Sequence, residues 1–212
     1  MKSFFDKLFT KDGLKRILFS FVWLALLIFV IDIITKWVVQ NNLKDNPSGV
    51  TLIPNFLHII LTHNLGASFG MGSNGELGWR IFWISVSIIL TGVLIFVFTK
   101  YFAKFNKLQR AALALMIGGA FGNMIDRIFY WNSIVGFDGV IDWIDFQFGS
   151  WHFATFNIAD SALVIGVIII IFVEVVNIIK DVKMKRERGD YDLSPEELEA
   201  KLKENEKDNN QQ

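Results

Sequence analysis

Carboxylate and amide side chains recur in this sequence at intervals that bring them together on a helix. Asn123 and Asp126 are three residues apart, and Asn157 and Asp160 repeat that interval. Residues three or four apart lie on one face of an α-helix, so each pair should point in one direction. Carboxylates held in this way can move protons to and from a substrate. The full polar set is Asp32, Lys36, Asn64, Asn123, Asp126, Arg127, Asp142, Asp145, Asn157 and Asp160.

Other catalytic devices find little support in the sequence. There is no cysteine, and Ser, Thr and His form no recognisable catalytic triad. His58, His63 and His152 lack the spacing of metal ligands, so we interpret them as loop or interface residues. A metal site made of carboxylates alone stays open but has no supporting motif. We therefore expect no metal and no cofactor.

The remaining device is a pair of carboxylates that share one proton. Repulsion between them separates their pKa values, so one is ionised while the other is protonated. The residues alone do not decide which two form the pair. The candidates are Asp126, Asp142, Asp145 and Asp160.

The polar set stands out because the surrounding chain is strongly apolar. Of the 212 residues, 52% are hydrophobic and 15% are aromatic, which is more than a soluble domain of this length needs. A bilayer-spanning helix needs about 20 apolar residues. Four segments meet that length, namely 17–39, 81–98, 111–130 and 159–179. The polar residues gather near one boundary of these spans, where charged groups usually face a cavity or one another.

The distribution of Lys and Arg predicts the orientation of the spans. The N-terminal extension (1–16), the connection between the second and third spans and the stretch after the fourth hold fourteen of them, against three in the other two connections. Positive residues favour the cytoplasmic side, so we expect both termini to be cytoplasmic and segments 40–79 and 131–158 to be outside. The prediction is an all-α polytopic membrane protein with a four-helix domain over 17–180 and a charged cytoplasmic tail over 181–212. The formal charge of zero gives no basic excess for nucleic acid.

The segments outside the spans carry their own patterns. Residues 50–60 are β-branched and aromatic and precede a Gly-rich turn, which predicts a short sheet or hairpin on the outer face. Residues 131–156 hold eight aromatic side chains, a density typical of the headgroup region. Residues 3–9 put their apolar side chains on one side, which is typical of an interfacial helix, and a frayed tail is an equal alternative. Residues 194–197 form a capping box that predicts a short helix in the tail.

Each polar feature also has a purely structural explanation. Asp32 and Lys36, four residues apart, would form an ion pair near the interface. Arg127 would reach toward lipid headgroups or brace a carboxylate, and Asn157 would only cap a helix. The glycines of 118–122 would only let the third span approach a neighbour closely.

Five ordered blocks of the sequence resemble the lipoprotein signal peptidase family (signal peptidase II). The blocks are DIITKWVVQNNL from Asp32, HNLGASFGMG from His63, GGAFGNMIDRI from Gly118, GVIDWIDF from Gly139 and FNIADSALVIGV from Phe156. They span residues 32–167, which is nearly all of the expected membrane domain. The N-terminal extension and the tail lie outside the resemblance.

This resemblance implies an aspartyl protease of the bacterial cytoplasmic (inner) membrane whose active site faces the outer leaflet. It would remove the signal peptide from diacylglyceryl-modified prolipoproteins by cutting before the lipidated cysteine, without a cofactor, and globomycin-like peptides would inhibit it. Asp142 and Asp160 would be the catalytic dyad, and a small extracytoplasmic β-cradle would correspond to residues 40–79. The residues that would bind substrate or support the dyad are Asn64, Gly66, Asn123, Asp126, Arg127 and Asn157. Asp32 and Lys36 would give structural support.

Three other functions fit the sequence less well than a peptidase. A transporter or proton channel needs polar steps across the whole bilayer, yet Glu174 lies about 21 Å along the helix from Asp160 with nothing ionisable between them. A lipid-binding or scaffold protein would be favoured only by loss of a dyad member, and both are present. A membrane hydrolase acting on a different bond is disfavoured only by the family resemblance.

Overall fold

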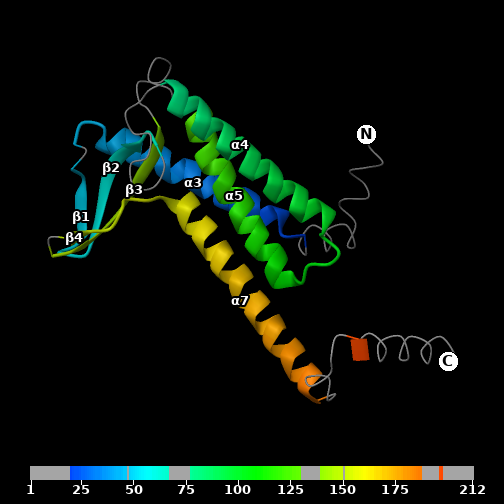
Figure 1. The fold of residues 1–212 in the computed structure, drawn as a ribbon. Coiled ribbons are helices and arrows are strands. Elements are labelled where there is room, and N and C mark those ends of the chain that lie inside the picture. The colour runs from blue at the N-terminus through cyan, green and yellow to red at the C-terminus, as the bar shows by residue number, and fades with distance from the viewer. Residues whose placement is uncertain are drawn as a thin grey trace, which may run out of the picture. The chain divides into compact units, whose positions relative to one another are not determined.

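The computed structural model describes residues 20–46, 48–66, 77–129, 139–149, 151–187 and 196–197. Four of its helices are long and apolar enough to cross a membrane, as the sequence predicted (Figure 1). They are α3 (Val22–Leu43), α4 (Leu77–Lys100), α5 (Lys107–Phe129) and α7 (Ile158–Glu187). The predicted interfacial helix at 3–9 and the first half of the predicted capping box at 194–197 lie outside the described residues. The orientation of the termini stays a prediction.

Each helix extends beyond the apolar run that predicted it at one end or both, and in α5 a cap defines the start. Helix α5 begins at Lys107, four residues before the predicted span. The backbone N–H of Gln109 donates to Asn106 Oδ1 at 2.9 Å, and the backbone N–H of Asn106 donates to Gln109 Oε1 at 2.9 Å. This reciprocal cap satisfies donors that the first turn leaves unpaired. Helix α7 continues to Glu187, within the segment predicted as the tail.

Small residues on α5 let its neighbours approach closely. A Cβ atom added at Gly118 would lie 2.5 Å from the carbonyl oxygen of Ala25 on α3. One added at Gly119 would collide with the carbonyl oxygen of Ala159 at the start of α7, and one at Gly122 with the carboxylate of Asp32. The close-approach explanation of these glycines is confirmed, and the approach brings polar groups of three helices together.

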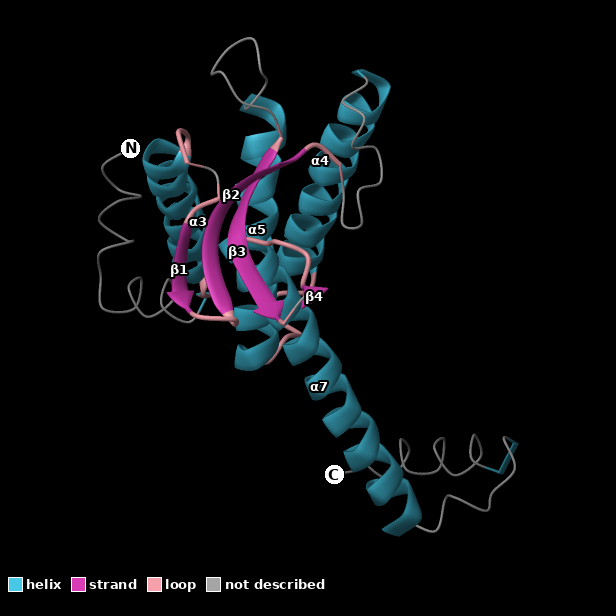
Figure 2. Cartoon of the chain, turned by 90° about the vertical axis from the view of Figure 1, so that its left-hand side faces the viewer, coloured by secondary structure: helices cyan, strands magenta, loops and turns pink. Residues whose placement is uncertain are grey.

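Four antiparallel strands form one small sheet in the order β1-β2-β3-β4 (Figure 2). They are β1 (Val50–Ile53), β2 (Leu57–Asn64), β3 (Val140–Phe148) and β4 (Trp151–His152). The predicted hairpin near 50–60 is confirmed as β1 and β2. The expectation that the β-structure belongs to 40–79 was incomplete, because β3 and β4 come from the second outer segment. The aromatic residues assigned there to the headgroup region include members of a strand.

The sheet packs on the ends of α3 and α5, and this contact positions the site. Strands β2 and β3 both contact α3, and β3 also contacts α5. Val39 and Leu43 of α3 form one buried cluster with Leu61 of β2 and Ile141 of β3. Internal packing divides the chain into a unit that ends at Ile170 and another that begins at Ile171, and the candidate site lies in the first unit.

Candidate active site

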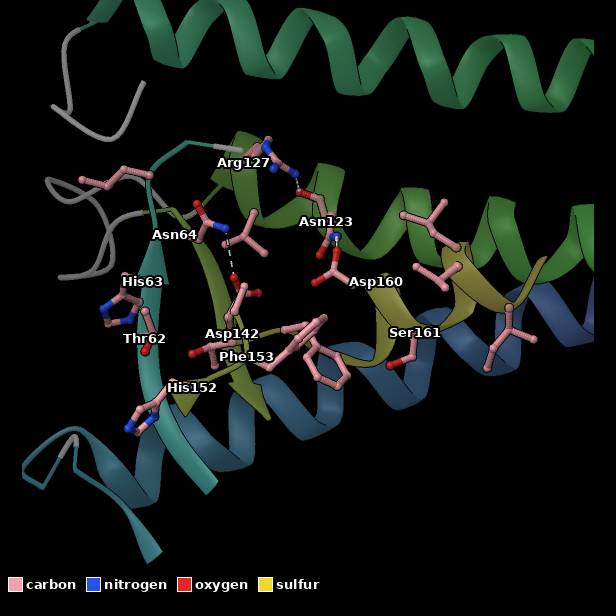
Figure 3. A pocket seen from close by; sticks show the side chains of 18 of the residues that line it. Thr62, His63, Asn64, Asn123, Arg127, Asp142, His152, Phe153, Asp160 and Ser161 are labelled. Carbon is pink, nitrogen blue, oxygen red and sulfur yellow. Dashed lines mark hydrogen bonds between the residues drawn. The ribbon is translucent and has the colours of Figure 1, made fainter. Parts of the chain in front are cut away.

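Two of the four candidate carboxylates line the same pocket. Asp142 lies on β3 and Asp160 in the first turn of α7, and their side chains point toward one another (Figure 3). The pocket has a volume of about 1180 Å³, and its walls come from the end of β2, the start of β3, the segment around β4, and helices α5 and α7. Asp126 and Asp145 do not belong to its lining.

Asp160 is held by a capping box at the start of α7. Its backbone N–H donates to Asn157 Oδ1 at 2.9 Å, and the backbone N–H of Asn157 donates to Asp160 Oδ2 at 3.2 Å. A carboxylate in this position also interacts favourably with the partial positive charge of the helix N-terminus. The capping explanation for Asn157 is therefore confirmed, and it accounts for one of the four hydrogen bonds of this side chain.

Asp142 accepts hydrogen bonds on both of its oxygens. Asn157 Nδ2 donates to Oδ1 at 2.7 Å, and Asn64 Nδ2 donates to Oδ2 at 3.0 Å. Only 3% of Asp142 is exposed. Burial, followed by the negative charge of Asp160, raises the pKa of Asp142 to about 7, although the Asn64 and Asn157 hydrogen bonds and the charge of Lys36 act in the opposite direction. Asp142 is thus suited to carry a proton near neutral pH.

Asn123 of α5 joins Asp160 to the interior of the protein. Its Nδ2 donates to Asp160 Oδ1 at 2.7 Å. Its Oδ1 accepts from Asn157 Nδ2 at 3.1 Å and from Lys36 Nζ at 2.9 Å. Both oxygens of Asp142 and both oxygens of Asp160 therefore accept hydrogen bonds from amide groups.

Lys36 lies at the centre of a buried ion triad. Its Nζ is 2.7 Å from Asp32 Oδ2 and 2.7 Å from Asp126 Oδ2, and the three side chains are fully buried. Asp32 Oδ1 accepts from the backbone N–H of Ala159 at 2.9 Å, and Asp126 Oδ2 accepts from that of Ile141 at 3.4 Å. The predicted ion pair of Asp32 and Lys36 exists, and Asp126 joins it as a third member. Through these contacts the triad connects α3 and α5 with β3 and α7.

Arg127 faces the pocket and braces the end of β2. Its Nη2 donates to the carbonyl oxygen of Gly66 at 3.3 Å, and its Nη1 donates to that of Asn123 at 3.4 Å. The backbone N–H of Gly66 donates in turn to Asn64 Oδ1 at 3.1 Å. Asn64 is therefore fixed with its amide nitrogen toward Asp142, as Figure 3 shows.

Asp145 belongs to a separate cluster on the sheet. It accepts from Gln147 Nε2 at 2.7 Å, and its Oδ2 lies 3.4 Å from His152 Nδ1 and 3.9 Å from His58 Nδ1. His152 and His63 also line the pocket, which the sequence did not predict because neither lies at a recognisable interval from the dyad. Within the described ranges, no three His, Cys, Asp or Glu side chains are grouped to hold a metal.

Four membrane-length helices, two of which line a pocket with two facing carboxylates, define a polytopic membrane protein with the groups of an acid–base enzyme. The family model described as signal peptidase (SPase) II matches residues 24–176. The lipoprotein signal peptidase of Actinobacillus succinogenes is 39% identical over 150 residues, which cover 70% of this chain and 85% of that protein. The one from Vibrio cholerae is 36% identical over 160 residues, which cover 75% of this chain and 88% of that protein.

Solved structures agree with the sequence relatives. Two that are described as bacterial membrane enzyme structures obtained by the in meso method match with TM-scores of 0.60 and 0.59. They are 31% and 32% identical, and the matches cover 78% and 73% of this chain and 91% of each structure. The chain belongs to the signal peptidase II family, which confirms the resemblance seen in the sequence.

Proposed function

We propose that the chain is an aspartic endopeptidase that removes the signal peptide from diacylglyceryl-modified prolipoproteins, cutting before the lipidated cysteine. Its relatives are named lipoprotein signal peptidases. The observation that carries the aspartic mechanism is the pair Asp142 and Asp160, which line one pocket and accept amide hydrogen bonds on all their oxygens. Such a pair, with the pKa of Asp142 raised to about 7, can hold one proton between two carboxylates.

In the proposed reaction, Asp160 is ionised and Asp142 is protonated. Asp160 takes a proton from water as the water oxygen bonds to the scissile carbonyl carbon, and Asp142 gives its proton to the carbonyl oxygen. The product is a neutral tetrahedral diol. The carbon–nitrogen bond then breaks, the leaving nitrogen takes the proton from Asp160, and a diol hydroxyl returns a proton to Asp142. Both carboxyl groups end the cycle in their starting states.

The supporting residues divide by position. Arg127, Asn64 and Asn123 line the pocket, so they are placed to contact substrate as well as to hold the dyad. Asn157 is fully buried and acts through the two carboxylates. Gly66 acts through its backbone contacts with Arg127 and Asn64. Asp126, also fully buried, acts with Asp32 and Lys36 as a brace.

The apolar wall of the pocket is consistent with a substrate that carries acyl chains. Leu163, Val164 and Ile165 of α7 line the pocket, and Val164 and Ile165 are 58% and 50% exposed. Such side chains can accept acyl chains that stay in the bilayer. Because positive residues favour the cytoplasm, we place the dyad at the outer face of the bacterial cytoplasmic membrane. Membrane lipid and globomycin-like peptides are expected partners at this site, and nucleic acid is not.

This proposal is tested by offering one prolipoprotein in two forms, with and without diacylglycerol on its cysteine. We expect cleavage of the modified form alone, between the cysteine and the residue before it, as read by mass spectrometry. A saturating globomycin-like cyclic peptide should stop it. Equal cleavage of the unmodified form, or cleavage at another bond, would refute the proposed substrate.

A further inference from the structure

Three acceptor atoms lie within hydrogen-bonding distance of the Lys36 ammonium group. The ammonium lies 2.7 Å from Asp32 Oδ2, 2.7 Å from Asp126 Oδ2 and 2.9 Å from Asn123 Oδ1. An ammonium group has three N–H bonds and no acceptor. Two of its contacts satisfy buried carboxylates, and the third reaches an uncharged amide that itself contacts the dyad.

The third contact decides which way the Asn123 amide faces. The oxygen and nitrogen of an amide can exchange places by rotation, so a fixed neighbour must set the orientation. Lys36 can only donate, so the amide oxygen faces Lys36 and Nδ2 faces Asp160 Oδ1 at 2.7 Å. In the opposite orientation two donors would meet at Lys36, and an amide oxygen would meet the carboxylate of Asp160.

The other neighbour of this amide is a weaker constraint. Asn157 Nδ2 also reaches Asn123 Oδ1, at 3.1 Å, but it has two hydrogens for three acceptors. The other two acceptors are Asp142 Oδ1 at 2.7 Å and the carbonyl oxygen of Ile141 at 3.2 Å. The orientation of Asn157 itself does not need Lys36, because the backbone N–H of Asp160 donates to its Oδ1.

We propose that Lys36 is a positioning residue for the dyad: its buried ammonium fixes the Asn123 amide, which keeps a donor on Asp160 Oδ1. The inference rests on the proposed function, because it assigns Asp160 a role in the reaction. It goes beyond structural support, since it links a residue that does not line the pocket to one carboxylate through one named amide. Replacing Lys36 should therefore lower turnover when Asn123 is present and have no further effect when Asn123 is absent.

A double-mutant cycle tests this link. Lys36→Met and Asn123→Ala should each lower kcat by about 10- to 100-fold, the range for losing a hydrogen bond to a charged group. Lys36→Met should change KM little, because Lys36 does not line the pocket. The double variant should be no slower than the slower single variant, because both changes remove the same contact. Both singles should move the acidic limb of the pH profile of kcat/KM in the same direction. Lys44→Met, an exposed substitution at the end of α3, should leave kcat unchanged.

Additive losses in the double variant, or an unmoved pH profile, would overturn the inference. Lys36→Met leaves two buried carboxylates without a cation, so this variant can unfold. The cycle is therefore repeated with Asp32→Asn, Lys36→Met and Asp126→Asn combined. This combined variant has no buried charge in the triad. A wild-type kcat in that combination would show that Lys36 only balances charge. If Asp142→Asn and Asp160→Asn are inactive while the cycle is additive, this inference fails and the proposed function stands. If those two variants are active, the proposed function itself fails.

Discussion

Asn157 donates a hydrogen bond of 2.7 Å from its amide to Asp142, although it is also the residue that caps the helix carrying Asp160. One side chain thus joins two carboxylates that are 18 residues apart in the sequence. Strand β3 and the start of helix α7 are therefore held together where the proposed reaction occurs. Because of this double role, loss of the Asn157 side chain should affect both folding and catalysis.

Replacing Asn157 by Ala should lower both stability and turnover. Loss of an N-cap costs about 0.5–2 kcal/mol, and loss of the donor to Asp142 should lower kcat by about 10- to 100-fold. The matched control is Asn106→Ala, which removes the corresponding cap of α5. It should lose similar stability while keeping kcat, as measured by thermal unfolding and by cleavage in the same detergent. Equal kcat losses in both variants would show that Asn157 acts only as a cap.

The raised pKa of Asp142 predicts a loss of activity on the alkaline side. The reaction needs Asp142 protonated, so kcat/KM should fall as the pH rises through about 7. The Asn64 hydrogen bond lowers the pKa of Asp142, so Asn64→Leu should move this alkaline limb to higher pH. An alkaline limb that shifts to lower pH in this variant would contradict the assigned contact.

The same pKa has a consequence for stability, with a defined sign. The folded-state pKa of Asp142 lies above its ordinary value of 3.8, so the folded protein binds this proton more tightly than the unfolded chain. The resulting contribution to the free energy of unfolding is fully present below about pH 4 and is lost as the pH rises through about 7. Asp142→Asn should abolish this part of the pH dependence in denaturant titrations between those values. An unchanged pH dependence of the free energy of unfolding in this variant would show that a group other than Asp142 titrates in this range.

Gly119 controls how closely α5 approaches the start of α7. A methyl group there would collide with the carbonyl oxygen of Ala159, next to Asp160, so Gly119→Ala should cost about 1–3 kcal/mol of stability and lower kcat as well. Gly92→Ala on α4 is the control, because a Cβ atom there meets nothing within 4 Å. Its stability should stay the same or rise by about 0.5–1 kcal/mol. Equal behaviour of the two variants in thermal unfolding would contradict the close contact between Gly119 and Ala159.

The membrane helices could be predicted because length and apolar composition alone determine such spans. Strand β3 was not recognised, because its aromatic residues fit the headgroup region equally well. Recognising it would have separated two of the candidates: Asp142 and Asp145 are three residues apart, and an odd interval on a strand places side chains on opposite faces. The structure has Asp142 in the pocket and Asp145 among the histidines of the sheet.

The contacts between distant segments could not be predicted from spacing. The intervals correctly paired Asp32 with Lys36 and Asn157 with Asp160, because both pairs lie within one turn of a helix. Nothing local indicated that Lys36 also contacts Asp126 and Asn123 on another helix. Those contacts depend on the close approach of α3 to α5, which arises from packing across the fold.

Cleavage of a diacylglyceryl-modified prolipoprotein by Asp142→Asn and Asp160→Asn tests the central claim most directly. Asp145→Asn is the control, because Asp145 is buried on the same strand but does not line the pocket. Both dyad variants should remain folded and lose cleavage by about 10³-fold or more, while the control keeps most of its activity. Cleavage near the wild-type rate by either dyad variant would contradict the assignment of Asp142 and Asp160 as the catalytic pair.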